Sequence, residues 1–100
     1  MEIDEKGGRI LAQKAKVGHV AGIPLATVLR VNRERTIPIE RYEEDGCFDR
    51  FKYLQGIADE NNVPLAGVID TADLLGADED FDGLVTTVED HGPELRAAYS

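Results

Sequence analysis

The spacing of apolar residues changes near the middle of this chain, and that change sets the class of fold. Before Asp45-Gly46, apolar side chains alternate with polar ones, as in 25–31. After Asp45-Gly46 they recur every three or four residues, from Phe48 onward. Alternation is typical of a half-buried strand, and the longer spacing is typical of an amphipathic helix. The sequence therefore predicts an α+β fold, in which a small antiparallel N-terminal sheet packs with three C-terminal helices.

The predicted sheet covers residues from about 9–42. Gly18 and Gly22 favour a turn between two strands, because glycine adopts the left-handed backbone that tight turns use. Residues 25–31 form the next expected strand, and 37–39 alternate again in a third. The proline within 37–39 has no backbone donor, so we expect that strand at the edge of the sheet.

Three helices are predicted after this sheet. The first covers about 47–61, where apolar residues fall at helical spacing and a pair of asparagines supplies the stop. The second covers about 64–75, with a proline in its first turn and a glycine after its end. The third covers about 79–91, with Asp78 as its cap and Gly92-Pro93 as its end.

A short internal echo favours another conformation for part of the sheet. Residues 23–29, Ile-Pro-Leu-Ala-Thr-Val-Leu, return as 63–69, Val-Pro-Leu-Ala-Gly-Val-Ile. The second copy lies in a predicted helix, so a true repeat would make 24–33 a helix as well. The choice between strand and helix over 23–33 therefore stays open.

Length, cysteine content and hydropathy limit the class of protein. One hundred residues fit a single domain covering 1–100. Cys47 is the only cysteine, so no internal disulfide can form. No apolar run approaches the ~18 residues of a membrane span. The start, Met1-Glu2-Ile3-Asp4-Glu5, is acidic where a signal peptide is basic. We therefore expect a cytoplasmic protein with no membrane partner.

Charge is distributed unevenly along the chain. The net charge is −9, but residues 1–41 carry +3 and residues 42–100 carry −12. An acidic half is suited to a protein partner with a basic surface. Packing of the two halves on each other, or adaptation to a salt-rich cytosol, would explain the same distribution. On the first interpretation, the partner-binding residues are Glu43, Glu44, Asp73, Asp80 and Asp82.

The basic half also carries a motif with a different meaning. Residues 16–31, Lys-Val-Gly-His-Val-Ala-Gly-Ile-Pro-Leu-Ala-Thr-Val-Leu-Arg-Val, resemble the helix-turn-helix of lac-repressor-type regulators. The resemblance implies helices over 16–21 and 24–33, the second of which enters the major groove of DNA. The alternative function is thus a DNA-binding transcriptional regulator that uses a helix-turn-helix at 16–33. Its nucleic-acid residues would be Thr27, Arg30, Arg33 and Arg35.

A third pattern lies within 78–89, which match the spacing of a calcium-binding loop. Asp78, Asp80 and Asp82 alternate, Gly83 supplies the turn, and Glu89 is the bidentate ligand. The apolar residues of the same segment share one helical face. A calcium loop and a helix exclude each other here, and the helix is the favoured interpretation.

The sequence contains no catalytic motif. His19, His91 and Cys47 are isolated, without the spacing of a metal site or of a nucleophile and its base. We therefore expect a non-enzymatic protein without a cofactor. The leading hypothesis is a small acidic interaction protein, such as an inhibitor, an antitoxin-like regulator or an adaptor, with a basic macromolecular partner. An exposed sheet edge would also let two copies pair as a homodimer.

Overall fold

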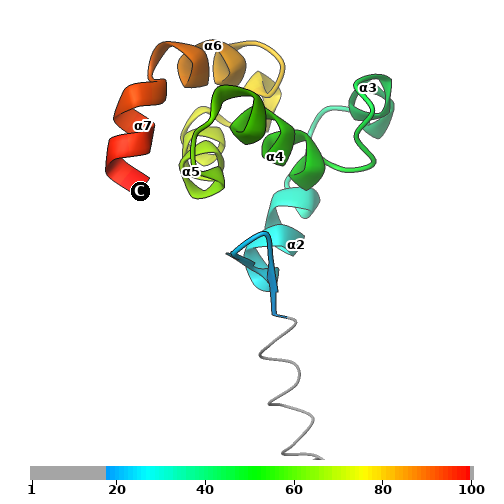
Figure 1. Ribbon diagram of the computed structural model, residues 1–100. Helices are drawn as coiled ribbons and strands as arrows, with labels where there is room; N and C mark the ends of the chain where they lie inside the picture. Colours follow the sequence, from blue (N-terminus) through cyan, green and yellow to red (C-terminus); the bar gives the residue numbers. More distant parts are fainter. Residues whose placement is uncertain (1–17, 100) are drawn as a thin grey trace, which may run out of the picture. The chain divides into compact units, whose positions relative to one another are not determined.

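A computed structural model describes residues 18–99 (Figure 1). The chain separates into two compact units, the first ending at Arg30 and the second beginning at Val31. Helix α2 (Leu25–Arg33) contributes residues to both units. The predicted start of the sheet, 9–17, lies outside the described residues.

The first unit contains a small antiparallel sheet, as predicted. Strands β1 (His19–Val20) and β2 (Ile23–Pro24) pair so that Val20 faces Ile23. The two residues between them, Ala21 and Gly22, have φ values of 53° and 81°. A two-residue hairpin loop of type I′ requires positive φ at both positions, and its twist matches that of the paired strands. The predicted turn at Gly22 therefore forms.

Residues 25–33, predicted as a strand over 25–31, are helix α2 instead. The apolar residues of this segment fit both periods, because Leu25, Leu29 and Val31 belong to an alternating series, whereas Val28 and Val31 are three residues apart as on a helix face. Both are buried, whereas Leu29 is 56% exposed. Pro24 lies directly before the helix, and Pro64 lies directly before helix α5 (Leu65–Leu75). The internal echo thus indicated the correct conformation.

The helix-turn-helix expected at 16–33 is wrong in its first half. Residues 18–24 form the hairpin, so a first helix over 16–21 is not present in the part of that segment that is described. The physical reason is the pair of positive φ values at Ala21 and Gly22, which would interrupt a helix. The second helix of the motif is present as α2.

The third predicted strand, 37–39, is also replaced by helix. Helix α3 (Ile39–Glu44) begins directly after Pro38, whose backbone is extended at φ −54° and ψ 142°. Proline suits the start of a helix as well as the edge of a sheet, because its missing donor is not needed in the first turn. Among residues 18–42, the sheet is therefore confined to 19–24.

The two helices predicted next agree with the structure. Helix α4 (Arg50–Asn61) lies within the predicted 47–61, and α5 lies within 64–75. Asn62 ends α4 in the left-handed conformation with φ 54°, and Gly76 follows α5 with φ 93°. These residues terminate helices because they tolerate positive φ.

The third predicted helix, 79–91, is divided. A single 3₁₀ turn, η1 (Ala77–Glu79), precedes helix α6 (Gly83–Asp90). Gly92-Pro93, expected to end a helix, instead opens α7 (Gly92–Tyr99). The first turn of a helix needs no donor from proline, so this dipeptide starts a helix as readily as it stops one.

The core of the second unit lies between α4, α5 and α6, with α7 against α5 (Figure 1). Helices α4, α5 and α6 each contribute one buried apolar face, as in other packed helical layers. None of the helices in the described part of the chain has the length and apolar content of a membrane span. The buried apolar residues of this unit are Val31, Tyr42, Phe51, Tyr53, Leu54, Ile57, Ala58, Val63, Val68, Ile69, Ala72, Leu84 and Val88.

Candidate functional site

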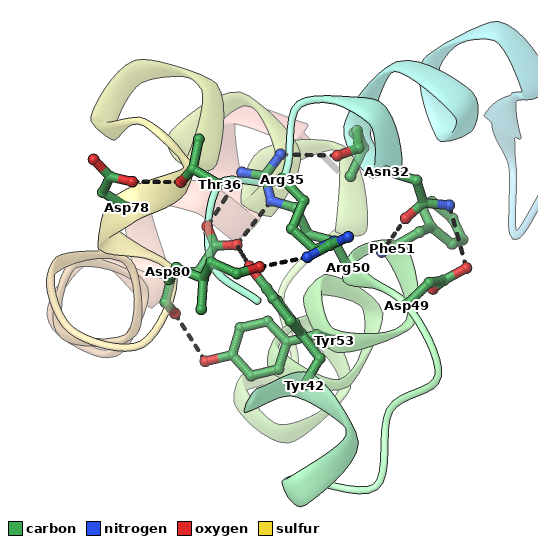
Figure 2. A network of polar contacts seen from close by, with 12 residues as sticks. Asn32, Arg35, Thr36, Tyr42, Asp49, Arg50, Phe51, Tyr53, Asp78 and Asp80 are labelled. Atoms are coloured by element: carbon green, nitrogen blue, oxygen red, sulfur yellow. Dashed lines mark hydrogen bonds and ion pairs between the residues drawn. The ribbon is translucent and has the colours of Figure 1, made fainter. Parts of the chain in front are cut away.

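A buried ion pair links α4 to the segment before α6. Arg50 is 2% exposed and Asp80 is 0% exposed. The Arg50 Nε donates to Asp80 Oδ2 at 2.7 Å, and Nη2 donates to Oδ1 at 3.1 Å (Figure 2). The Arg50 Nη1 donates to the Val31 carbonyl oxygen at 3.1 Å. A guanidinium fork matched to both carboxylate oxygens is a strong, well-oriented contact.

Two tyrosines complete this network. The Tyr42 hydroxyl donates to Asp80 Oδ2 at 2.6 Å, and the Tyr53 hydroxyl donates to the Asp80 carbonyl oxygen at 2.8 Å (Figure 2). Their rings pack together with the ring of Phe81, at centroid distances of 4.4 to 5.4 Å. The polar ends of the tyrosines thus meet one carboxylate residue while their rings fill the space between α3, α4 and α6.

The same contacts hold both tyrosines in the neutral form. Burial raises the pKa of Tyr42 well above its usual value, and the hydrogen bond to Asp80 and the charge of that carboxylate raise it further. Burial also raises the pKa of Tyr53, and the negative charge of Asp45 adds to this effect. Neutral hydroxyls donate to Asp80 throughout the physiological pH range. This network therefore has a structural role: it joins α3 and α4 to the segment before α6, and we call it the Arg50–Asp80 joint.

A second set of contacts fixes the start of α4. The Asp49 carboxylate accepts the backbone N–H of Lys52 at 2.8 Å, as a helix cap does. Asn32 donates to the same carboxylate at 3.2 Å and accepts the backbone N–H of Phe51 at 2.9 Å (Figure 2). These bonds satisfy two backbone donors that would otherwise be unpaired at the helix start. They place Arg50 in position to reach Asp80.

A pocket of about 470 Å³ opens beside this joint. Its apolar lining comes from Tyr53 and Ile57 of α4, from Phe81, and from Val85 of α6. Gly56 also lines it, and a Cβ added at Gly56 would meet nothing within 4 Å. The volume is in the range of ordinary ligand pockets, ~300–1,000 Å³.

The polar lining of the pocket is mostly acidic. Asp45, Glu60 and Glu89 contribute carboxylates, and Arg41 contributes one guanidinium. The Arg41 Nη1 lies 3.2 Å from Asp45 Oδ1, and its Cζ lies 4.0 Å from the centroid of the Phe81 ring. Within residues 18–99, no basic side chain forms an ion pair with Glu60 or Glu89. The pocket thus combines an aromatic floor with two carboxylates that are not neutralised by a basic side chain.

Cys47 lines the pocket without the character of a nucleophile. Burial raises the pKa of its thiol, and the carboxylates of Asp45, Asp49 and Glu60 raise it further. The thiolate is the reactive form, and a raised pKa reduces its population at neutral pH. Neither His19 nor His91 is among the residues that line this pocket. The aromatic ring and the carboxylates of the lining are groups that attract a cation.

The residues predicted to bind a partner occupy different places. Glu43 and Glu44 are exposed on α3, and Asp82 is exposed directly before α6. Asp73 is exposed on α5, which contributes no residue to the pocket lining. Asp80 is buried in the ion pair with Arg50, so its carboxylate does not reach the surface. Of the predicted partner-binding residues, therefore, only Glu43, Glu44 and Asp82 are both exposed and close in the chain to residues that line the pocket.

The residues predicted to bind nucleic acid lie on or after α2. Thr27 and Arg30 belong to the first unit, whereas Arg33 and Arg35 belong to the second. Arg35 Nη1 donates to the Ile37 carbonyl oxygen at 2.6 Å, so this guanidinium is held by the loop that follows α2 (Figure 2).

The residues of the calcium-loop alternative, within 78–89, do not converge on one point as the ligands of a calcium ion would. Asp78 accepts a hydrogen bond from the Thr36 hydroxyl, and Asp80 is bound to Arg50 (Figure 2). Glu89 lies within α6, which the helical stripe of this segment predicted. Across residues 18–99, no group of three or more histidine, cysteine, aspartate or glutamate side chains is placed to hold a metal ion.

Sequence reasoning missed the residues that matter most to this site. Arg50 was not singled out, and neither was the pocket between α4 and α6. One signal was present, because Arg50 falls on the apolar face of a predicted helix with Leu54 and Ile57. A charge on a buried face needs a partner of opposite sign, which the acidic segment at Asp80 supplies.

Comparison with known proteins adds no relative. No protein-family model, no curated protein and no solved structure matches this chain.

Proposed function

We propose that this protein is a non-enzymatic interaction module that binds a basic surface on a protein partner. The observation that carries this proposal is the pocket lined by α4, α6 and the end of α3, with its aromatic side chains and with Glu60 and Glu89, which form no ion pair among residues 18–99. Aromatic rings combined with carboxylates are suited to cationic side chains of another protein. An inhibitor, an antitoxin-like regulator and an adaptor would all use such a surface.

The charge of the second unit supports the same proposal. Residues 31–100 contain 17 acidic and six basic side chains. Two of these six are already engaged by carboxylates, since Arg50 pairs with Asp80 and Arg41 pairs with Asp45. The remaining surface is strongly negative, which attracts a basic protein and repels the phosphates of DNA.

The exposed acids next to the pocket extend this binding surface. Glu43 and Glu44 lie on α3 beside Arg41 and Asp45, and Asp82 follows Phe81 in the chain. Charges at the rim of an interface mainly accelerate association and select the partner, whereas a central pocket contributes most of the affinity. We assign Glu43, Glu44 and Asp82 to the rim, and the pocket to the centre.

Direct binding measurements test this proposal. A short fluorescent peptide rich in arginine and lysine should bind the full chain, with an affinity that falls as salt rises. An acidic peptide of equal length and duplex DNA should not bind. Glu43→Lys and Asp82→Lys should each weaken binding of the basic peptide by about fivefold, or ~1 kcal/mol.

Glu94→Lys is the matched control, because it changes the net charge equally from an exposed position on α7. It should leave the affinity of the basic peptide within about twofold of the unmodified chain. An equal loss in all three variants would show a general charge effect without a defined surface. Tighter binding to DNA than to the basic peptide would favour a regulator that uses Thr27, Arg30 and Arg33 of α2 together with Arg35.

A further inference from the structure

We infer that the pocket between α4 and α6 is a socket for a single arginine side chain of the partner protein, with Glu60 and Glu89 holding its guanidinium. This inference rests on the proposed function and names the group that the interaction module recognises. It follows from the shape of the pocket, from its chemistry and from a contact already present within it.

The shape comes from two lines of side chains. Tyr53, Ile57 and Glu60 are spaced by four and then three residues, so they share one face of α4. Val85 and Glu89 are four residues apart and share one face of α6. The span from Tyr53 to Glu60 is about 10 Å at 1.5 Å per helical residue. The lining therefore offers apolar contact for an aliphatic stem together with carboxylates for a charged end.

An internal contact shows which cation suits this lining. Arg41 lies on the Phe81 ring and pairs with Asp45 at the edge of the same pocket. The protein thus already places one guanidinium against an aromatic ring and a carboxylate there. A planar guanidinium stacks and forms paired hydrogen bonds, whereas an ammonium does neither as well. The remaining carboxylates of the lining, Glu60 and Glu89, are free of ion pairs among the described residues and so are available to a guanidinium supplied by a partner.

Gly56 supplies the access that a partner chain needs. It lies between Tyr53 and Glu60 on α4, and a Cβ built there would meet nothing within 4 Å. Other residues would project a side chain into the pocket at this point. The backbone of a partner can therefore approach α4 closely enough for an arginine to reach between the two helices.

Titration of the ¹⁵N-labelled full chain with N-acetylarginine amide tests the socket. The expected result is saturable change in the amide shifts of Gly56, Glu60, Val85 and Glu89, with a millimolar dissociation constant. N-acetylcitrulline amide has the same shape without the charge and should produce no saturable change. N-acetyllysine amide with a free ε-amine should bind more weakly than the arginine probe. Shifts that grow linearly, or that spread evenly over the acidic surface, would overturn the inference.

Matched variants separate the socket from general charge. The double variant Glu60→Gln with Glu89→Gln should weaken binding of the arginine probe by about tenfold. The double variant Asp59→Asn with Asp90→Asn removes the same charge from neighbouring exposed positions and should change binding by less than twofold. Equal losses in the two double variants would overturn the inference.

Gly56 provides a second, charge-free test. Gly56→Leu should abolish binding of the arginine probe by filling the pocket, whereas Gly56→Ala leaves most of the volume and should retain binding. If the basic peptide binds Gly56→Leu and the Glu60→Gln, Glu89→Gln variant as well as the unmodified chain, the socket is wrong and the interaction module stands. If the basic peptide does not bind the unmodified chain, the proposed function itself fails.

Discussion

Arg50 and Asp80 are the residues on which the second unit most depends. Both charges are buried, and each compensates the other for the hydration lost on folding. Asp80 also accepts a hydrogen bond from Tyr42, so one carboxylate joins α3 and α4 to the segment between η1 and α6. Removal of one partner leaves the other charge buried without compensation. The free energy of unfolding therefore depends strongly on the presence of both residues, although the intact pair contributes little net stability.

Asp80→Asn should therefore destabilise the protein by about 3 kcal/mol, the lower end of the range for breaking a buried ion pair. The measurement is the free energy of unfolding from urea titration followed by circular dichroism. Asp82→Asn is the control, because Asp82 is exposed two residues away. It should change the free energy of unfolding by less than about 0.5 kcal/mol. Similar values for the two variants would contradict a structural role for the pair.

Tyr42 and Tyr53 make the stability sensitive to alkaline pH. Their pKa values are raised in the folded protein, so the unfolded chain ionises first, near pH 10.0. The folded form then binds more protons than the unfolded form, and the free energy of unfolding decreases as pH rises. The stabilisation is fully present below pH 10.0 and is lost above it.

We expect a loss of up to about 1.4 kcal/mol per pH unit for each tyrosine above pH 10. Urea unfolding between about pH 8 and pH 11 measures this slope. Tyr42→Phe should lower the stability at pH 8, because Asp80 loses a donor, and should also reduce the slope above pH 10. An unchanged slope in Tyr42→Phe would show that the pKa of Tyr42 does not differ between the folded and the unfolded protein.

Among the helices, α4 and α5 offer a direct comparison of two buried or half-buried glycines. Gly56 of α4 has open space where a Cβ would lie. At Gly67 of α5, a Cβ would lie 3.1 Å from Cδ1 of Tyr99 on α7. Glycine inside a helix costs about 0.5–1 kcal/mol relative to alanine when the site has room for the methyl group.

Gly56→Ala should accordingly raise the stability by about 0.5–1 kcal/mol, or by ~2–8 °C in Tm. Gly67→Ala should gain less or lose stability, because Tyr99 must move and its hydrogen bond to Asp70 is disturbed. Thermal unfolding followed by circular dichroism measures both variants. A larger gain for Gly67→Ala than for Gly56→Ala would contradict the packing of α7 against α5.

At this scale, sequence patterns identified some elements and not others. Helices α4 and α5 were predicted because the spacing of their apolar residues indicates a helix, and because asparagines end the first while Pro64 and Gly76 bound the second. Helix α2 was misassigned because its apolar residues fit both periods, and proline at position 38 was interpreted as a strand edge when it opens α3. Local patterns are ambiguous where two conformations bury the same residues.

For the whole molecule, the excess of acid makes stability depend on salt. Residues 31–100 contain 17 acidic and six basic side chains. The excess acidic side chains repel one another at low ionic strength. Screening shortens the reach of this repulsion from about 30 Å at 0.01 M salt to about 3 Å at 1 M. The buried pair of Arg50 and Asp80 is screened far less than the surface charges.

We expect Tm at neutral pH to rise by about 4–8 °C between these two concentrations of sodium chloride, equivalent to about 1 kcal/mol. The variant with Glu43→Gln, Glu44→Gln and Asp82→Asn should show a smaller rise, because it carries less surface charge. Differential scanning calorimetry measures both. A Tm that is independent of salt would mean that the acidic residues are too far apart to repel one another.

The sequence by itself determined the acidic character of the second unit, the hairpin turn at Gly22, and helices α4 and α5, because charge, turn chemistry and helix caps are local properties. Only the tertiary structure decided the joint of Arg50 with Asp80 and the pocket that carries Glu60 and Glu89. The members of these sites are 29 to 30 residues apart in the chain. Their contact follows from the packing of α4 against the segment around α6, and packing depends on which buried faces meet in three dimensions.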